Sequence, residues 1–132
     1  MELKYDIVIT GIGNLAKAFL AGSHSVILID EGVRPNLAEM VVEHTPGELT
    51  EDIQVGDKLL IGGGKFSIIK VGDQVNANLR QEGHCTIIFN AEGTLPGQMI
   101  VKGTTKPVLS EGAHISIEKK ASRRTTKKAK TE

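Results

Sequence analysis

The sequence predicts an all-β domain, and three observations carry that prediction. Aromatic residues make up only 3% of the 132 residues, so the core must rest on Ile, Val and Leu. The β-branched residues together with 15 glycines favour short strands and tight turns over helices. Apolar runs of about four to six residues recur along the chain, separated by breaks that carry Gly, Pro or Asp. This rhythm is typical of a small β-barrel or a β-sandwich.

The strands are expected where the apolar runs lie. In chain order these runs are Tyr5–Thr10, Ser25–Asp30, Glu39–Glu43, Lys58–Ile61, Phe66–Val71, Cys85–Asn90, Gln98–Lys102 and His114–Glu118. The segment Val55-Gly56-Asp57 predicts a turn that opens the fourth strand, and Gly62-Gly63-Gly64 predicts a hairpin after it. A phosphate loop is the competing interpretation of these glycines, but Phe66 follows Lys65 where that motif needs Ser or Thr.

Two stretches predict short helices. Asn14–Ala21 is short and apolar, whereas Asp73–Glu82 has Asp73 as an expected N-cap and Gly83 as a stop signal.

Charge divides the chain into a body, residues 1–118, and a tail, residues 119–132. Seven of the 16 Lys and Arg residues lie in the tail, whereas 15 of the 16 acidic residues lie in the body, which carries a net charge of −6. The tail lacks apolar periodicity and is expected to be a disordered basic segment. It could attract nucleic acid or an anionic membrane, but without interleaved aromatic residues a solubilising role is favoured over nucleic-acid binding.

The single cysteine, Cys85, excludes an intramolecular disulfide framework, and its place at a strand start suggests a small core residue. The sequence has neither an export signal nor a run of 18 apolar residues. We therefore expect a cytoplasmic protein.

A dinucleotide-binding motif is suggested by Gly11-Ile12-Gly13-Asn14-Leu15-Ala16, which follows a strand-like run and precedes a helix-like one. Asp30, about 20 positions on, is placed to bind a ribose hydroxyl. However, the helix is short for a crossover and the later strands follow one another without the βαβ alternation. Dinucleotide binding is therefore weaker than the two functional hypotheses that follow.

The segment around His44 is the most informative part of the chain. It ends an apolar run and is followed at once by Pro46-Gly47, so we expect an exposed imidazole where a strand breaks into a turn. Neutral imidazole is nucleophilic near neutral pH, but the local pattern alone favours a surface histidine beside a turn.

The other histidines carry weaker signals. His24 and His114 have ordinary loop or strand-edge interpretations, and no histidine pair has metal-site spacing, so no metal or cofactor is expected. His84 follows the helix stop at Gly83, where it could face another strand end or simply stabilise the turn.

A set of landmarks resembles the glucitol/sorbitol-specific IIA component of the bacterial phosphotransferase system over roughly residues 2–118. The landmarks are His44-x-x-Gly47-Glu48-Leu49, Val55-Gly56-Asp57-Lys58-Leu59-x-Ile61-Gly62, Val71-Gly72, Asn78-Leu79-Arg80-x-x-Gly83-His84-x-Thr86 and Leu95-Pro96-Gly97. The resemblance implies a small closed β-barrel that acts as a phosphocarrier. His44 would accept a phosphoryl group from phospho-HPr and pass it to a cysteine of the cognate IIB component. With the membrane-embedded IIC component this energises sorbitol uptake, and no sugar binds the IIA protein itself.

The chemistry of phosphoryl transfer then suggests roles for residues around His44, although Thr45-Pro46 departs from the family pattern. Thr45 and the backbone near Gly47 would bind phosphoryl oxygens, and His84 would assist as a second imidazole. Glu48 belongs to an acidic surround, which also contains Glu43, Glu51 and Asp52 and would steer a basic partner such as HPr. A non-catalytic β-barrel binding or regulatory module is the alternative function.

Overall fold

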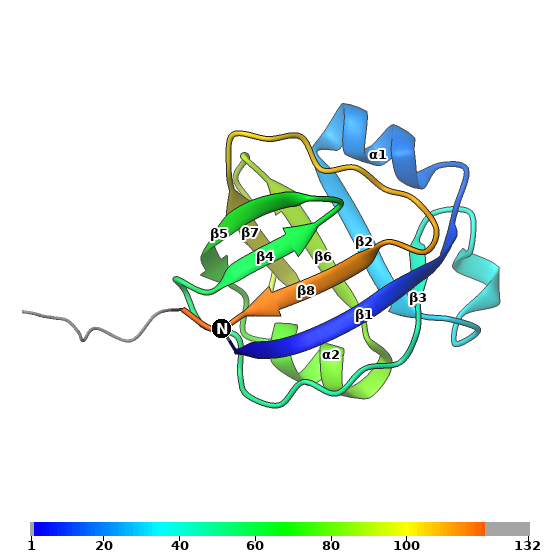
Figure 1. Cartoon of the computed structure of the whole chain (residues 1–132). Helices are drawn as coiled ribbons and strands as arrows, with labels where there is room; N and C mark the ends of the chain where they lie inside the picture. The colour runs from blue at the N-terminus through cyan, green and yellow to red at the C-terminus, as the bar shows by residue number, and fades with distance from the viewer. Residues whose placement is uncertain (1, 121–132) are drawn as a thin grey trace, which may run out of the picture.

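Eight strands close into a barrel in the computed structural model, which describes residues 2–120 (Figure 1). The order around the barrel is β1-β3-β2-β6-β7-β5-β4-β8, with β8 returning to β1. The strands are β1 (Leu3–Ile12), β2 (Ser25–Asp30), β3 (Val42–His44), β4 (Lys58–Ile61), β5 (Gly64–Val71), β6 (Cys85–Phe89), β7 (Gln98–Lys102) and β8 (His114–Glu118). The prediction of an all-β, small closed barrel is thus confirmed.

Most neighbouring strands are antiparallel, but β2–β3 and β6–β7 run parallel. The parallel pair β2–β3 places Asp30 directly beside His44, because those two residues are register partners at the ends of their strands. The strands β2 and β6 are antiparallel, with Ser25 opposite Ile88 and Leu28 opposite Cys85. The start of β6 therefore lies at the same end of the barrel as the end of β2.

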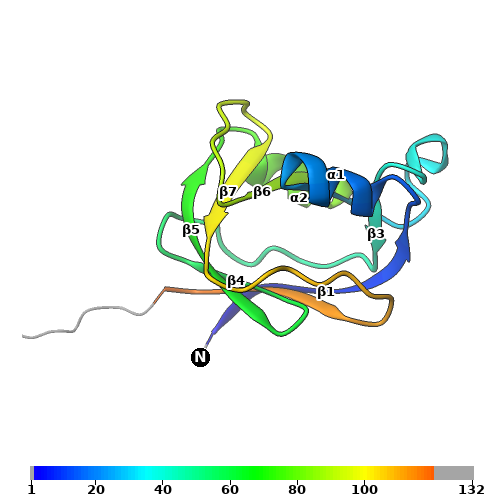
Figure 2. The same cartoon turned by 90° about the horizontal axis from the view of Figure 1, so that it is seen from above.

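Two short helices lie at opposite ends of the barrel, α1 (Ala16–Ser23) and α2 (Val75–Glu82) (Figure 1), and they overlap in the view from above (Figure 2). The α1 helix starts two residues later than expected, and the predicted N-cap of α2 is wrong. Gln74 occupies the N-cap without a side-chain hydrogen bond, so Asp73 lies outside the helix. The predicted stop at Gly83 is confirmed, since Gly83 adopts the left-handed conformation that ends many helices.

The glycine hairpin between β4 and β5 is also confirmed. Gly62 and Gly63 form its two-residue turn with φ values of 54° and 84°. Positive φ at both central positions is the signature of a turn whose twist matches the flanking strands, and glycine adopts it without strain.

A buried ion pair fastens the turn before β4 to the first strand. The Lys4 ammonium lies 2.8 Å from Asp57 Oδ2, and both side chains are almost completely buried. Asp57 also accepts hydrogen bonds from the backbone N–H groups of Gln54 and Lys120. Burial alone would raise the pKa of the Asp57 carboxyl, but these hydrogen bonds outweigh it and hold that pKa below its ordinary value.

The end of the described chain follows the barrel. The backbone N–H of Lys119 donates to Glu2 and that of Lys120 to Asp57, so these first two residues of the predicted tail are bound to the barrel. The remainder of that predicted basic tail, residues 121–132, lies outside the described residues.

The core fills the barrel with branched aliphatic side chains, as the composition predicts. Ile7, Ile68 and Ile87 are almost fully buried, and the rings of Phe66 and Phe89 meet edge to face with centroids 5.1 Å apart. Cys85 is part of this core, and burial raises the pKa of its thiol to about 12. A thiol in this environment remains protonated, in keeping with the core position expected for it.

The glycine-rich segment that resembles a dinucleotide motif has a structural role at the end of β1. Gly11 and Ile12 are the last residues of β1, and the N–H groups of Gly13 and Leu15 donate to the carbonyls of Val41 and Glu39. A side chain at Gly13 would overlap the backbone at Ala38, so glycine is required for this packing. Because β3 lies between β1 and β2, the parallel βαβ unit of a dinucleotide fold does not form here.

Within residues 2–120, neither helix has the length and apolar character that crossing a membrane requires.

Candidate functional site

His44 is the last residue of β3 and lies between β1 and β2, opposite Ile9 and Asp30. Its side chain is fully buried, with 0% exposure, so the expectation of an exposed imidazole is wrong. The reason lies in the segment that follows. Pro46-Gly47 makes no turn, and the chain continues along β1 with Thr45 N–H bonded to the Val8 carbonyl. This extended segment covers the strand end that a turn would have left open.

Both ring nitrogens of His44 meet backbone carbonyls. Nδ1 lies 2.8 Å from the Thr45 oxygen, and Nε2 lies 3.0 Å from the Gly83 oxygen. Only the imidazolium can donate to both oxygens, because neutral imidazole has one N–H and one lone pair. In the neutral form, one nitrogen therefore turns its lone pair toward a carbonyl oxygen. The two carbonyls hold the ring in place but leave one contact unfavourable whenever the ring is neutral.

Asp30 supplies the only carboxylate with a close contact to this imidazole in the described chain, with Oδ1 3.7 Å from His44 Nδ1. Asp30 Oδ1 is buried and has no hydrogen-bond partner within residues 2–120. Burial raises the pKa of the Asp30 carboxyl, the nearby His44 lowers it, and Glu82 and Glu31 raise it, with a net increase. The ionised form of Asp30 is therefore disfavoured, and its carboxylate lies beside Nδ1 of His44, the nitrogen that also contacts Thr45.

Tyr5 forms the other wall of the site. Its ring meets the imidazole of His44 edge to face at a centroid distance of 6.3 Å. The Tyr5 hydroxyl is buried without a hydrogen-bond partner in the described part of the chain. Its pKa is raised, mainly by burial and further by the charge of Asp30, so the phenol stays protonated.

Gly83 closes the site from the α2 side. It has φ of 64°, and a Cβ there would overlap Asp30 Oδ1 and lie 2.7 Å from His44 Cε1. Only a residue without a side chain lets the α2–β6 junction approach the imidazole this closely. The helix stop predicted from the sequence thus also shapes the site.

Three other residues predicted for the site, His84, Thr45 and Gly47, each make contacts of their own. His84 is half-buried, directly after Gly83, and its backbone N–H donates to Asn78. The hydroxyl oxygen of Thr45 accepts the Val8 N–H at 3.0 Å. Gly47 packs against Ile7, where a Cβ would come within 2.5 Å of a methyl group.

Glu48 is exposed, and no hydrogen bond joins it to His44 among residues 2–120. Two members of the expected acidic surround are neutralised by ion pairs. Glu51 lies 3.1 Å from Lys119, and Asp52 lies 2.6 Å from Arg80. Glu43 accepts the backbone N–H of Gly32. The negative charge near His44 therefore comes more from Asp30 and its acidic neighbours than from the segment after His44.

Sequence reasoning missed Asp30 and the carbonyl of Gly83 as parts of this site. The sequence pattern around Asp30 indicates only a ribose ligand, because the proximity of Asp30 to His44 depends on the parallel pairing of β2 with β3. The one available signal was that both residues end strand-like runs. The remaining two histidines lie elsewhere, His24 at the end of α1 and His114 on β8, beside Asp6.

Fold and site together define a small β-barrel domain with one imidazole held between strand ends by two carbonyls and a carboxylate. The family model described as "PTS system glucitol/sorbitol-specific IIA component" matches residues 4–116, and the chain belongs to this family. It is thus a component of a phosphotransferase system.

Two curated relatives are similar to the chain over most of its length. The PTS system glucitol/sorbitol-specific EIIA components of Shigella flexneri and Escherichia coli K12 are each 29% identical over 120 residues. In both comparisons the match covers 89% of this chain and 97% of the relative. A solved structure, the PTS system IIA component from Enterococcus faecalis V583, has a TM-score of 0.75 at 24% identity. It covers 86% of this chain and 98% of its own, and at this identity it supports the fold alone.

Proposed function

We propose that the protein is a phosphocarrier that takes a phosphoryl group from phospho-HPr on His44 and passes it to a cysteine of a IIB component. With the IIC component at the membrane, this transfer would energise sorbitol uptake without sugar binding to the barrel. The protein would act at the cytoplasmic face. Membership of the IIA family supports the class of reaction. The observation that carries the residue assignment is the imidazole of His44, held by two carbonyls beside Asp30.

Nε2 is the nitrogen that we assign as the phosphoryl acceptor. A proton on Nδ1 is stabilised by the Thr45 oxygen at 2.8 Å and by the negative charge of Asp30. The lone pair of the neutral ring then lies on Nε2, facing the Gly83 oxygen. A hydrogen bond that fixes the tautomer at one nitrogen prepares the other as nucleophile.

Access to Nε2 requires the Gly83 carbonyl to move, because the imidazole is fully buried in this conformation. The contact itself favours such a movement. A lone pair and a carbonyl oxygen at 3.0 Å repel each other when the ring is neutral, and Gly83 is the left-handed residue at which α2 ends. In the proposed cycle, the partner binds and the α2–β6 junction shifts. The phosphoryl group then occupies the place that the carbonyl vacated.

The transfer itself needs little covalent machinery from the protein. The bond from phosphorus to the HPr imidazole breaks as the bond to His44 Nε2 forms, and the Nδ1 proton stays in place. Catalysis is then mainly positioning and stabilisation of the phosphoryl oxygens. We assign the latter to backbone N–H groups around Gly47, the Thr45 hydroxyl and His84, each of which lies in a segment that borders His44. Asp30 stabilises the positive charge on the phosphorylated ring.

A non-catalytic binding or regulatory barrel is the competing function, and the complete burial of His44 is the observation that favours it. Incubation with phosphoenolpyruvate, enzyme I and HPr, followed by intact mass, separates the two. We expect the wild type to gain one acid-labile phosphoryl group, and His44→Gln to gain none while keeping its circular dichroism spectrum. His114→Gln is the matched control, because His114 is exposed on β8. Equal phosphoryl gain by His44→Gln and the control would show that the assignment is wrong.

A further inference from the structure

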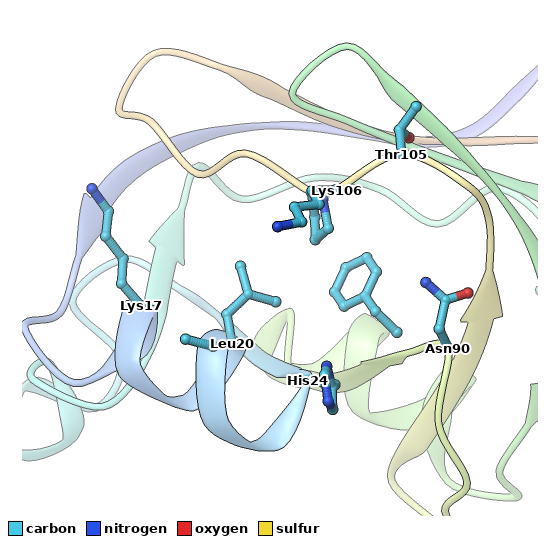
Figure 3. A pocket seen from close by; sticks show the side chains of 9 residues that line it. Lys17, Leu20, His24, Asn90, Thr105 and Lys106 are labelled. Carbon is cyan, nitrogen blue, oxygen red and sulfur yellow. The ribbon is translucent and has the colours of Figure 1, made fainter.

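A pocket of about 530 Å³ lies on the α1 side of the barrel (Figure 3). It is bounded by the end of α1, the end of β6 and the loop before β8. Its nine lining residues are Lys17, Leu20, Ala21, His24, Phe89, Asn90, Thr105, Lys106 and Pro107. Pockets of 300 to roughly 1,000 Å³ that combine an apolar lining with a few polar groups are typical of small-molecule sites.

The charge of this pocket is opposite to that of the body. The lining contains two lysines and a histidine but no acidic residue, whereas residues 1–118 carry a net charge of −6. Neither Lys17 nor Lys106 takes part in an ion pair or a side-chain hydrogen bond within residues 2–120. The ammonium of Lys106 points into the hollow in Figure 3. The Lys106 ammonium therefore faces the cavity, whereas the Lys17 ammonium lies at its edge and points away from it (Figure 3).

The backbone at the pocket is unusual. Within the described part of the chain, His24 and Asn90 are the only residues other than glycine with positive φ, at 57° and 55°. Both line this pocket. The two residues are linked through Phe89, whose N–H donates to the His24 carbonyl. His24 adopts this conformation as the C-cap that ends α1, and asparagine adopts it more readily than most residues, so it shapes the pocket wall without by itself marking a functional site.

Asn90 is also oriented by a specific contact. Its Oδ1 accepts the Gly103 N–H at 2.9 Å, which leaves the amide nitrogen directed toward the cavity (Figure 3). The pocket thus presents a neutral donor and the Lys106 ammonium over an apolar floor formed by Leu20, Phe89 and Pro107, with Lys17 at the edge.

The pocket is remote from His44. The strand β2 begins beside His24 and ends at Asp30, six residues later, which corresponds to about 20 Å of extended chain. The strand β6 runs the other way, from the junction at Gly83 to Phe89 at the pocket. The pocket and the His44 site therefore occupy opposite ends of one strand pair, and a ligand in the pocket would leave His44 free.

We propose that this pocket is a second, independent site that binds a small organic anion, with its phosphate or carboxylate on Lys106 and on Lys17, whose exposed side chain rotates toward the pocket on binding, and its apolar part over Leu20 and Pro107. Charge-assisted hydrogen bonds from the two ammonium groups provide the anion selectivity. The apolar floor excludes a simple inorganic ion as the best ligand, because such an ion leaves that surface exposed to water.

Isothermal titration with phenyl phosphate tests this site, with benzyl alcohol and inorganic phosphate as the ligands that lack the charge or the apolar ring. We expect saturable binding of phenyl phosphate with Kd of about 1 mM or tighter, and weaker binding of both control ligands. The double variant Lys17→Gln/Lys106→Gln should lower the affinity at least roughly tenfold. Lys102→Gln is the matched control, since Lys102 is exposed on β7 and outside the lining.

A second variant tests the cavity without changing its charge. Ala21→Phe, on the exposed surface of α1, should fill the hollow and abolish binding while leaving the fold intact. Binding should persist in His44→Gln, so the result does not depend on the proposed phosphoryl transfer. No binding of phenyl phosphate, binding that survives both the double variant and Ala21→Phe, or equal affinity for inorganic phosphate would overturn the proposal.

Discussion

Replacement of Gly83 by alanine is the sharpest test of the site, because this residue brings the α2–β6 junction against both Asp30 and His44. Two costs arise. An alanine at φ of 64° is strained by about 1–2 kcal/mol. Its Cβ would also overlap Asp30 Oδ1 and lie 2.7 Å from His44 Cε1, and overpacking of this kind typically costs about 1–3 kcal/mol.

Gly112→Ala carries only the first cost, so the difference between the two variants measures the second. Gly112 has φ of 88°, but a Cβ there would meet no atom within 4 Å. We therefore expect Gly112→Ala to lower the free energy of unfolding by about 1–2 kcal/mol and Gly83→Ala by about 2–5 kcal/mol in urea titrations. The Asp30 carboxylate can relieve the overlap by rotating away, which would bring the cost toward the lower value but remove its charge from His44.

A displaced α2–β6 junction or a rotated Asp30 carboxylate would each change the surroundings of His44, the proposed phosphoryl acceptor. Gly83→Ala should therefore slow phosphoryl gain in the HPr assay under conditions where the protein is fully folded, whereas Gly112→Ala should not. If the two variants lose the same stability and accept phosphoryl groups at the same rate, the close approach at Gly83 has no role and the reasoning about the site is refuted.

Three further predictions concern buried charges. Asp30→Asn should raise the free energy of unfolding near neutral pH. The raised pKa of Asp30 makes its ionised form unfavourable in the fold, so this carboxyl lowers stability as pH rises above 3.8. The rate of phosphoryl transfer should nevertheless fall by on the order of 10- to 100-fold, and an unchanged rate would contradict the role of Asp30. Lys4→Met should cost about 3–5 kcal/mol in urea unfolding because it leaves Asp57 buried without its partner, and a cost below about 1 kcal/mol would show that the pair is unimportant. The lowered pKa of Asp57 contributes stability that is present above pH 3.8 and lost as pH falls through its folded value, so Asp57→Asn should flatten the acid limb of the unfolding curve.

The fold was largely predictable because its signals are local. The bounds expected for Ser25–Asp30, Lys58–Ile61, Gln98–Lys102 and His114–Glu118 are those of β2, β4, β7 and β8. Turn residues border most ends of these strands, so the end of the apolar run is also the end of the strand. The hairpin at Gly62 and Gly63 follows from the same local chemistry.

The geometry of the site was not predictable, because it depends on long-range pairing. A Pro-Gly pair favours a turn, yet Pro46-Gly47 lies in a segment held along β1 by hydrogen bonds at Thr45 and Thr50. That tertiary pairing covers His44. The partnership between His44 and Asp30 likewise requires the parallel pairing of two strands separated by 11 residues, which no local pattern encodes.

The closure of the barrel has a consequence for how the chain folds during synthesis. The first strand, β1, lies between β3 and β8, and Leu3 is paired with Glu118. Until β8 has been made, both β1 and β4 keep an unpaired edge. The barrel therefore cannot close before β8 has been made, and contacts of such long sequence separation favour slow folding. Until then, the unpaired edges of β1 and β4 can pair with those of other nascent chains. Pairing of β8 with both strands therefore ends the period in which aggregation is most favoured.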